Sequence, residues 1–329
     1  MMRMVLLICL VSFGAGREQG MEQCRDTLSV LFWNLENYFD WKENGDPENT
    51  SDKEFSSSGL RHWNRKRFLA KSNAIAKTLY WLEDRNGSLP DVIGVAEVEN
   101  ASVLGRLLAS TTLRKTDYAY VHYDSPDPRG IDVALLYRKS RLELVGSAPL
   151  KVGDGSRPFL TRDILLAVFR TERSDTVAFL VNHHPSKYGS DSEWKRVAAL
   201  ERLRSAVDSV QEHVTPNIVA MGDFNDTPDN PSFRIMTDGG NGMLNLAGPC
   251  HDRGEGTIRY SGKWDMIDMF FVSREIGNRL DGDMEIVHVP FLTVWDNTHS
   301  GEKPLRTYSG PRYLGGVSDH CPVHLKVPM

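Results

Sequence analysis

The sequence predicts an α/β protein, a four-layer α/β/β/α sandwich in which two packed mixed sheets lie between outer helices. Two observations predict this class. Short runs rich in β-branched and other apolar residues alternate along the chain with segments of helical periodicity. Many of these runs are continuously apolar, which is typical of strands that another layer covers. Two sheets packed face to face, with helices outside, provide that cover.

The expected elements follow from this pattern. Strands are expected at 28–35, 92–98, 131–137, 164–169, 177–182, 217–221, 266–272 and 323–327. Helices are expected at 65–84 and 192–210, where apolar residues recur every three or four positions. The polar, turn-rich stretches 42–59 and 290–316 are expected to be long surface segments, the second an insertion. No internal repeat is evident.

The N-terminal residues predict export. Residues 1–16 combine a basic residue, a short apolar stretch and a small-residue end, which is the pattern of a secretory signal peptide. Residues 17–26 are expected to be a linker and residues 27–329 one catalytic domain. The protein is then expected in the periplasm or outside the cell, as a monomer. No later segment is apolar enough to span a membrane.

Composition limits the function classes. Lys and Arg number 39 and Asp and Glu 44, so the net charge is -5 and a broad basic face for nucleic acid is not evident. The basic stretch 61–71 is expected to be a solvated helix face. The 4 cysteines show no CxxC spacing and do not indicate a metal site. A disulfide between Cys24 and Cys250 is left open.

Polar residues capable of chemistry follow the predicted strands where each strand ends. They are Asn34, Glu36, Glu97, Glu99, His183, His184, Asp223, Asn225, Asp265, Asp268, Asp319 and His320. Strand ends that meet at one edge of a sheet are where α/β folds form their sites. Carboxylates combined with neutral imidazoles favour Mg²⁺ or Mn²⁺ over zinc. The sequence therefore predicts a hard-metal site at this edge.

Several motifs occur in a familiar order. They are FWNLEN, VAEVEN, RGIDVALLYR, VNHHPSK, MGDFN, WDMIDMFFVS and VSDHCPV. From about residue 28 to its C-terminus the chain resembles the endonuclease/exonuclease/phosphatase superfamily, whose fold is that of pancreatic deoxyribonuclease. The combination of GDFN and SDH is specific, whereas either motif alone is weak evidence.

The resemblance implies a metal centre. Glu97 would be the principal Mg²⁺ ligand, with Glu36 and Asp319 holding the ion directly or through water, and Mn²⁺ could substitute. Asn34 would orient the phosphate or the metal-bound water. Glu99 lacks such support and is expected to be a loop residue.

The resemblance also implies the catalytic residues. Asp223 would align the attacking water or protonate the leaving oxygen, and Asn225 would hydrogen-bond a phosphoryl oxygen. His320 would be polarised by Asp268, chosen over its neighbour Asp265, and His184 would be the second imidazole on the phosphate.

Some positions involve a choice between neighbours. Adjacent strand residues face opposite sides, so one of His183 and His184 should enter the site, and His184 fits the motif better. Asp132 could orient His184, with a strand-edge acid as the alternative. Arg162 is expected to clamp a phosphate, with a surface ion pair as the alternative.

Within the 290–316 insertion, Arg306, Tyr308 and Tyr313 lie close in sequence to the SDH motif. We expect them to contact the substrate on this proximity alone.

These assignments predict a Mg²⁺-dependent phosphodiester hydrolase, with a nuclease acting on DNA or RNA as the leading reading. The alternative is a phosphatase or phospholipase C-like enzyme acting on inositol phosphates or sphingolipids. No exposed apolar hairpin is evident in the sequence, which weighs against a membrane lipid. The third reading, a non-catalytic binding module, would be favoured by loss of a site residue such as Asp223 or His320, and both are present.

Overall fold

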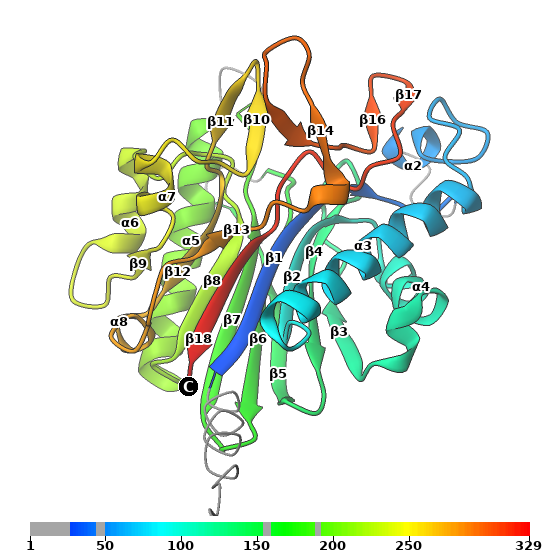
Figure 1. The fold of residues 1–329 in the computed structure, drawn as a ribbon. Coiled ribbons are helices and arrows are strands. Elements are labelled where there is room, and N and C mark those ends of the chain that lie inside the picture. The colour runs from blue at the N-terminus through cyan, green and yellow to red at the C-terminus, as the bar shows by residue number, and fades with distance from the viewer. Residues whose placement is uncertain (1–26, 44–49, 154–158, 188–191) are drawn as a thin grey trace, which may run out of the picture.

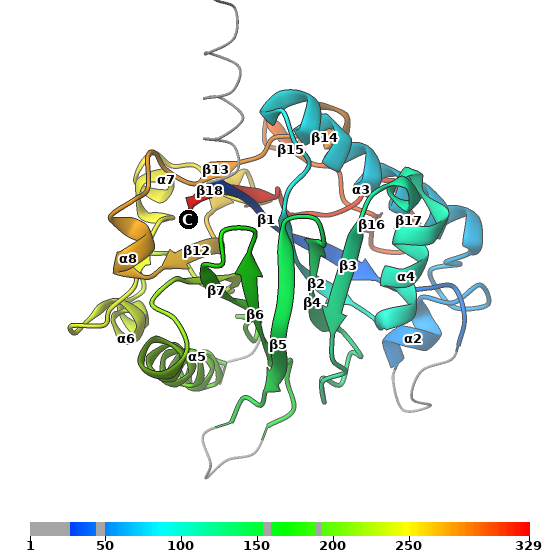
Figure 2. The same cartoon turned by 90° about the horizontal axis from the view of Figure 1, so that it is seen from below.

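The computed structural model describes residues 27–43, 50–153, 159–187 and 192–329. The predicted signal peptide, the linker and Cys24 lie outside the described residues. Two six-stranded sheets pack face to face, with helices on the outer faces (Figures 1 and 2). Both sheets contain parallel and antiparallel neighbours. The predicted four-layer α/β sandwich is therefore confirmed.

The first sheet has the order β13, β18, β1, β2, β4, β3. Its strands are β13 (Glu285–Ile286), β18 (Val323–Pro328), β1 (Thr27–Tyr38), β2 (Val92–Val98), β4 (Asp132–Arg138) and β3 (Tyr118–His122). The second sheet has the order β5, β6, β7, β8, β12, β9. Its strands are β5 (Leu142–Leu150), β6 (Ile164–Thr171), β7 (Thr176–His183), β8 (Ile218–Asp223), β12 (Asp268–Val272) and β9 (Leu244–Asn245).

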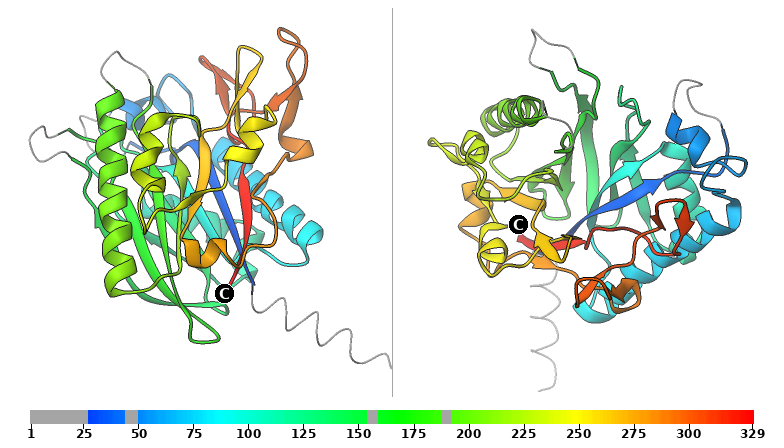
Figure 3. Two further views of the ribbon diagram at one scale, coloured as in Figure 1. Left: turned by 90° about the vertical axis from the view of Figure 1, so that its left-hand side faces the viewer. Right: turned by 90° about the horizontal axis from the view of Figure 1, so that it is seen from above.

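Helices cover the outer face of each sheet (Figure 3). Over the first sheet lie α3 (Arg65–Asn86) and α4 (Ala101–Ser110); over the second lies α5 (Glu193–His213). The short helices are α2 (Thr50–Glu54), α6 (Arg234–Thr237), α7 (Gly248–Asp252) and α8 (Arg274–Gly277). Helix α3 begins where the Asn64 side chain accepts a hydrogen bond from the Arg67 N–H and ends at Gly87, whose φ is 83°. Among the described helices, none combines the length and apolar character that a membrane span requires.

Side-chain alternation along β1 divides the apolar core. Val30 and Phe32 face the second sheet, whereas Leu31 and Trp33 face α3. Asn34 continues the row that faces the second sheet, and it is 1% exposed. Strand β1 thus places apolar side chains between the two sheets along most of its length and the polar side chain of Asn34 between them near its C-terminal end.

Three hairpins and some edge strands are absent from the sequence prediction. The hairpins are β10–β11 (Ile258–Tyr260, Lys263–Asp265), β14–β15 (Thr293–Trp295, Glu302–Pro304) and β16–β17 (Tyr308–Ser309, Arg312–Tyr313), which gather at the upper edge in Figure 1. The last two form much of the predicted 290–316 insertion. Strand β5 was missed because it is a largely exposed edge strand that contains Gly146 and Pro149.

A buried histidine on β18 couples the fold to pH. His324 is 3% exposed, and its Nε2 lies 2.8 Å from the Ser29 hydroxyl. Burial, aided by Lys326 and Arg85, lowers the pKa of His324 to about 4. The folded chain therefore keeps this imidazole neutral at a pH where the unfolded chain, with a pKa near 6.5, is protonated.

We predict that stability falls between pH 7 and pH 5, because only the unfolded His324 takes up a proton in that window. The loss from this group amounts to about 2 kcal/mol. Urea denaturation of the wild type and of His324→Asn at both pH values measures it. The variant should lose less stability than the wild type, and equal losses in the two proteins would contradict the assignment.

Candidate active site

The ends of β1 and β2 are distorted where they carry acidic residues. The β1–β2 register shifts within 34–38, and the β2–β4 register shifts within 96–98. Glu36 and Glu97 lie in these irregularities with φ of 45° and 60°. Non-glycine residues adopt such angles only where their surroundings impose them, and bulges re-aim side chains. The distortions therefore turn both carboxylates away from the directions that regular side-chain alternation along the strands would give them.

Hydrogen bonds hold these distorted residues in place. The Glu36 N–H donates to Asn34 Oδ1 at 2.9 Å, and the Asn37 N–H donates to Glu97 Oε2 at 2.8 Å. On the other side of the site the Thr307 N–H donates to Glu36 Oε2 at 2.8 Å. Each carboxylate is therefore fixed by a backbone donor.

Two hydrogen bonds join the two sheets at this edge. Asn34 Nδ2, on β1, donates to Asp223 Oδ2, at the end of β8, over 3.0 Å. His320, just before β18, lies with Nδ1 2.8 Å from Asp268 Oδ2, at the start of β12. These side chains are all buried. Residues from β1, β8, β12 and the segment before β18 thus meet where these strands end or begin, at the upper edge of the sandwich in Figure 1.

Polar groups surround one oxygen atom of Asp223. Besides Asn34, the Nε2 atoms of His183 and His320 lie 3.6 and 3.9 Å from Asp223 Oδ2. His183 Nε2 also lies 4.0 Å from Glu97 Oε1. The two imidazoles and the amide therefore converge on one point between the sheets.

His183, and not the predicted His184, is the imidazole that lies beside Asp223, so the geometry favours His183 as the second imidazole. The His184 ring packs edge-on against Phe224 with 4.8 Å between centroids. Within the described chain, neither of its ring nitrogens has a hydrogen-bond partner. Burial, with Arg162 nearby, lowers the pKa of His184 to about 3. Its backbone carbonyl serves the site instead, since it accepts from Asn225 Nδ2 at 2.9 Å.

Burial sets the protonation of the central groups. It raises the pKa of Asp223 to about 7, reinforced by the charge of Asp268. Burial alone would lower the pKa of His320, but Asp268 and then Asp223 raise it well above its usual value. Burial, followed by Arg162, lowers the pKa of His183 well below its usual value. One imidazole is thus held cationic and the other neutral.

The other acidic residues of the site have cationic neighbours: Arg129 was not predicted from sequence, and Arg306 was expected to contact the substrate rather than an acid. Arg306 Nη2 lies 2.9 Å from Glu36 Oε1 and 3.0 Å from Asp319 Oδ2, and Arg129 Nη2 lies 3.3 Å from Glu97 Oε2. Burial raises the pKa of Glu36 to about 7, and Asp319 adds to the rise, against the effect of Arg306. For Glu97, burial also acts to raise the pKa, but Arg129 and the Asn37 N–H lower it overall.

The prediction that the stretch 61–71 is a solvated helix face is wrong for Lys71, which is buried. It is 1% exposed, and its Nζ donates to the Glu36 carbonyl at 2.6 Å and to Thr307 Oγ1 at 2.8 Å. Burial lowers the pKa of Lys71 to about 8, although Glu36 opposes the shift. No sequence signal separates this lysine from its exposed neighbours except its position on the apolar face of α3.

The structure suggests where a metal ion fits. Among the described residues, two groups of acidic and histidine side chains have ligand atoms within 4.8 Å of one another: Asp223–Asp268–His320 and His122–Asp124–Asp132. The predicted trio of Glu36, Glu97 and Asp319 does not form such a group. Glu36 and Asp319 nevertheless share one cationic nitrogen, that of Arg306. Two carboxylates placed about one cation are a donor set that suits a hard divalent ion.

Two predicted supporting residues have other partners. Arg162 donates to Asp127 Oδ2 at 2.7 Å and to the carbonyls of His183 and His184 at 3.2 and 2.7 Å. These contacts favour a role in holding the end of β7 over the predicted clamp on phosphate. Asp132 contacts His122 Nε2 at 3.0 Å and accepts from the Ser125 N–H, so it does not orient His184.

The other expected residues are placed as follows. Asp265 lies exposed on β11, whereas Asp268 is buried and contacts His320. The Glu99 carboxylate accepts from the Asp40 N–H at 2.6 Å, beside the site rather than in it.

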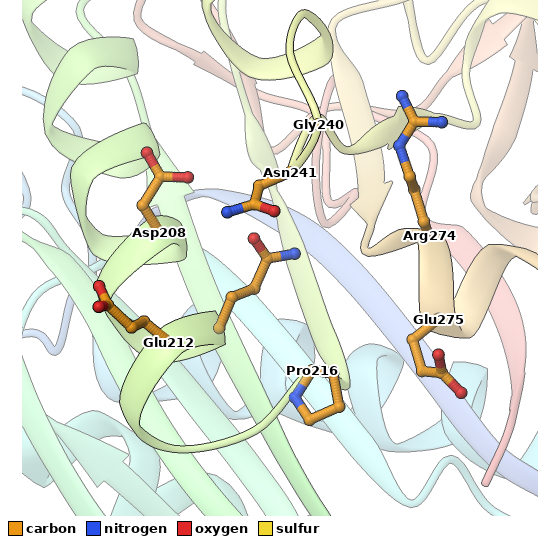
Figure 4. A pocket seen from close by; sticks show the side chains of 8 residues that line it. Asp208, Glu212, Pro216, Gly240, Asn241, Arg274 and Glu275 are labelled. Carbon is orange, nitrogen blue, oxygen red and sulfur yellow. The ribbon is translucent and has the colours of Figure 1, made fainter.

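A cavity of about 440 Å³ lies apart from these residues (Figure 4). It is lined by Asp208, Gln211, Glu212, Pro216, Gly240, Asn241, Arg274 and Glu275, none of which belongs to the predicted site. The size of a cavity therefore does not locate the chemistry in this protein, because the polar convergence lies at the strand ends.

Comparison with known proteins identifies the family of this chain. The model of the Endonuclease/Exonuclease/phosphatase family matches residues 29–328. The chain belongs to that family. The predicted family and enzyme class, a hydrolase of phosphate esters, are thereby confirmed. No curated protein gives a significant sequence match.

Solved structures share the fold at low identity. A family member from Bacteroides thetaiotaomicron is 15% identical with a TM-score of 0.57, covering 92% of this chain and 97% of that one. A mannosyl-6-phosphatase from the same species is 14% identical with a TM-score of 0.57, covering 92% and 100%. D. rerio TDP2 complexed with a single-strand DNA product is 12% identical with a TM-score of 0.52, covering 92% and 99%.

The neighbouring histidines make a matched test of the site. His183→Leu should lower the rate of phosphate ester hydrolysis by about 10²–10³-fold, because it removes a hydrogen-bonding imidazole beside Asp223. His184→Leu should keep the rate within about tenfold of the wild type, because its ring makes packing contacts that leucine can replace. Steady-state kinetics on both variants, with circular dichroism to verify folding, decides which of the two histidines takes part in catalysis. A larger loss in His184→Leu would return the catalytic role to that residue.

Proposed function

We propose that the protein is a Mg²⁺-dependent phosphodiester hydrolase that cleaves nucleic acid. The observation that carries the proposal is the convergence of Asn34, His183 and His320 on one oxygen of Asp223. Hydrolysis of a phosphodiester needs donors that neutralise the phosphoryl oxygens and an acceptor for the proton of the attacking water. This set of side chains contains both. The similarity to a TDP2 complexed with single-strand DNA supports nucleic acid as the substrate class.

The imidazoles take the electrostatic role. Asp268 accepts the hydrogen bond from Nδ1 of His320, so that Nε2 is presented to the phosphate. The raised pKa of His320 keeps this ring cationic at neutral pH, where it offsets the charge that develops on a phosphoryl oxygen. His183 stays neutral, and its Nε2, 3.6 Å from Asp223 Oδ2, is available to hydrogen-bond a phosphoryl oxygen.

Asp223 takes the proton-transfer role. A carboxyl group with a pKa of about 7 can accept a proton from water near neutral pH and return it to the leaving oxygen. Asn34 fixes the orientation of this carboxylate through its Nδ2. Glu36, Glu97 and Asp319 would hold Mg²⁺, or Mn²⁺ in its place, which supplies charge neutralisation for the phosphate and lowers the pKa of bound water.

Other substrates have specific support. The similarity to a mannosyl-6-phosphatase supports a phosphorylated small molecule, such as a sugar phosphate or an inositol phosphate, as the second candidate. Hairpin β14–β15 exposes 58% of Trp295 and 37% of Val294, which removes the sequence argument against a lipid headgroup. Export belongs to the proposal as well and is supported by the pattern of residues 1–16. The monomeric state stays a prediction.

A parallel substrate panel tests the proposal. Supercoiled plasmid, single-stranded RNA, inositol phosphate, mannose 6-phosphate and sphingomyelin are incubated with the full chain and Mg²⁺. We expect nucleic acid to be cleaved, EDTA to abolish cleavage, and Mg²⁺ or Mn²⁺ to restore it.

Matched variants complete the panel. His320→Asn should lose cleavage, because it removes the cation paired with Asp268, whereas His213→Asn, at the exposed end of α5, should keep it. Hydrolysis of the small phosphates or the lipid alone would overturn the nuclease assignment. Restoration by Zn²⁺ but not by Mg²⁺ would overturn the assigned metal.

A further inference from the structure

Arg306 sits where two acidic residues of the site share a cation. Its Nη2 lies 2.9 Å from Glu36 Oε1 and 3.0 Å from Asp319 Oδ2, and its Nε lies 3.1 Å from the same Glu36 oxygen. Without a positive neighbour, two carboxylates in such proximity repel each other. Arg306 therefore supplies positive charge in direct contact with both, beside the buried Lys71, and this charge lets the two carboxylates remain close together.

The backbone that carries Arg306 is fixed. The Thr307 N–H donates to Glu36 Oε2 at 2.8 Å, and Lys71 Nζ donates to Thr307 Oγ1 at 2.8 Å. Tyr308, 4% exposed, packs against the rings of Phe55, Trp63 and Tyr313. The insertion is thus attached to Glu36 by contacts that do not involve the guanidinium group.

The guanidinium group is paired with Glu36 and Asp319, but it lies at the surface and no apolar side chain has to move for it to leave. The Arg306 side chain is 47% exposed, in contrast to the 7% of Glu36. It lines a cavity of about 100 Å³ together with Arg61 and Tyr308. Rotation about the side-chain torsions can therefore carry the charge away from the carboxylates without disturbing the core.

A divalent ion and Arg306 cannot both occupy this position. An ion held by Glu36 and Asp319 would lie about 2.0–2.1 Å from their oxygens if it were Mg²⁺. The guanidinium nitrogen already lies close to both oxygens, and two cations at that separation repel each other. Metal binding therefore requires Arg306 to leave.

We propose that Arg306 exchanges with the divalent ion at Glu36 and Asp319, and that the displaced guanidinium then binds an anionic oxygen of the substrate. The proposal rests on the proposed function, which it deepens by naming a substrate-binding residue that metal binding releases. Arginine suits the second step because its planar donors match phosphate oxygens bidentately. A metal-free chain thus keeps its acidic site neutralised, and its phosphate-binding arginine becomes available only when the metal is bound.

Binding of Mn²⁺ without substrate tests the first step. Electron paramagnetic resonance titration of Arg306→Gln should show Mn²⁺ binding about tenfold or more tighter than the wild type, because a charged hydrogen-bonding competitor has been removed. Arg306→Lys, which keeps the charge but not the paired donors, should lie between the two. Arg312→Gln makes the same change of net charge at an exposed residue of the same insertion and should bind Mn²⁺ as the wild type does.

The split between KM and kcat tests the second step. Arg306→Gln should raise KM for the substrate about tenfold and leave kcat within about threefold, once Mn²⁺ is saturating. Unchanged or weaker Mn²⁺ binding in Arg306→Gln overturns the exchange, as does an equal gain in Arg312→Gln. An unchanged KM overturns the substrate contact. Absence of Mn²⁺ binding in every variant overturns the metal assignment and the exchange with it, whereas failure to cleave nucleic acid with normal Mn²⁺ exchange overturns only the proposed substrate.

Discussion

The hydrogen bond between Asn34 and Asp223 is the contact on which the site depends, because it ties β1 of one sheet to β8 of the other. Along most of their length the sheets are held by apolar side chains such as Phe32 and Met221. At this end a buried carboxylate takes their place, which is costly unless its oxygens are hydrogen-bonded. The cost is offset by Asn34 and by the Asn225 N–H, 2.9 Å from Asp223 Oδ1. The same bonds fix where a phosphate can be held.

Much of the framework could be predicted from sequence, because a buried strand gives a continuous run of apolar residues. The run at 92–98 coincides with β2, and the helix expected at 65–84 is α3, which extends to Asn86. Strand β5 could not be found, because an edge strand with one solvated face has no continuous apolar run. Sequence could not decide between His183 and His184 for a related reason. Strand β7 is apolar on both faces, so its alternation does not reveal which face meets Asp223.

The electrostatic partners were beyond sequence reasoning because they join distant segments. Arg306 and Glu36 are separated by 270 residues, and no periodicity sets that pairing. Lys71 lies in a basic stretch that reads as solvated, yet it is buried against the Glu36 carbonyl. The left-handed conformations of Glu36 and Glu97 could not be predicted either, because neither position holds the glycine that usually marks a positive φ. Bulges in the ladder impose these conformations, and bulges depend on the assembled sheet.

A crystal structure with Mn²⁺ and vanadate would test the central claim most directly, that distant strand ends surround one phosphoryl group. The account predicts the vanadate in contact with Asn34, His183 and His320, with the anomalous peak of Mn²⁺ beside Glu36 and Asp319. Vanadate bound elsewhere, for example in the cavity that Arg274 lines, with Asn34, His183 and His320 turned away from it, would contradict the account.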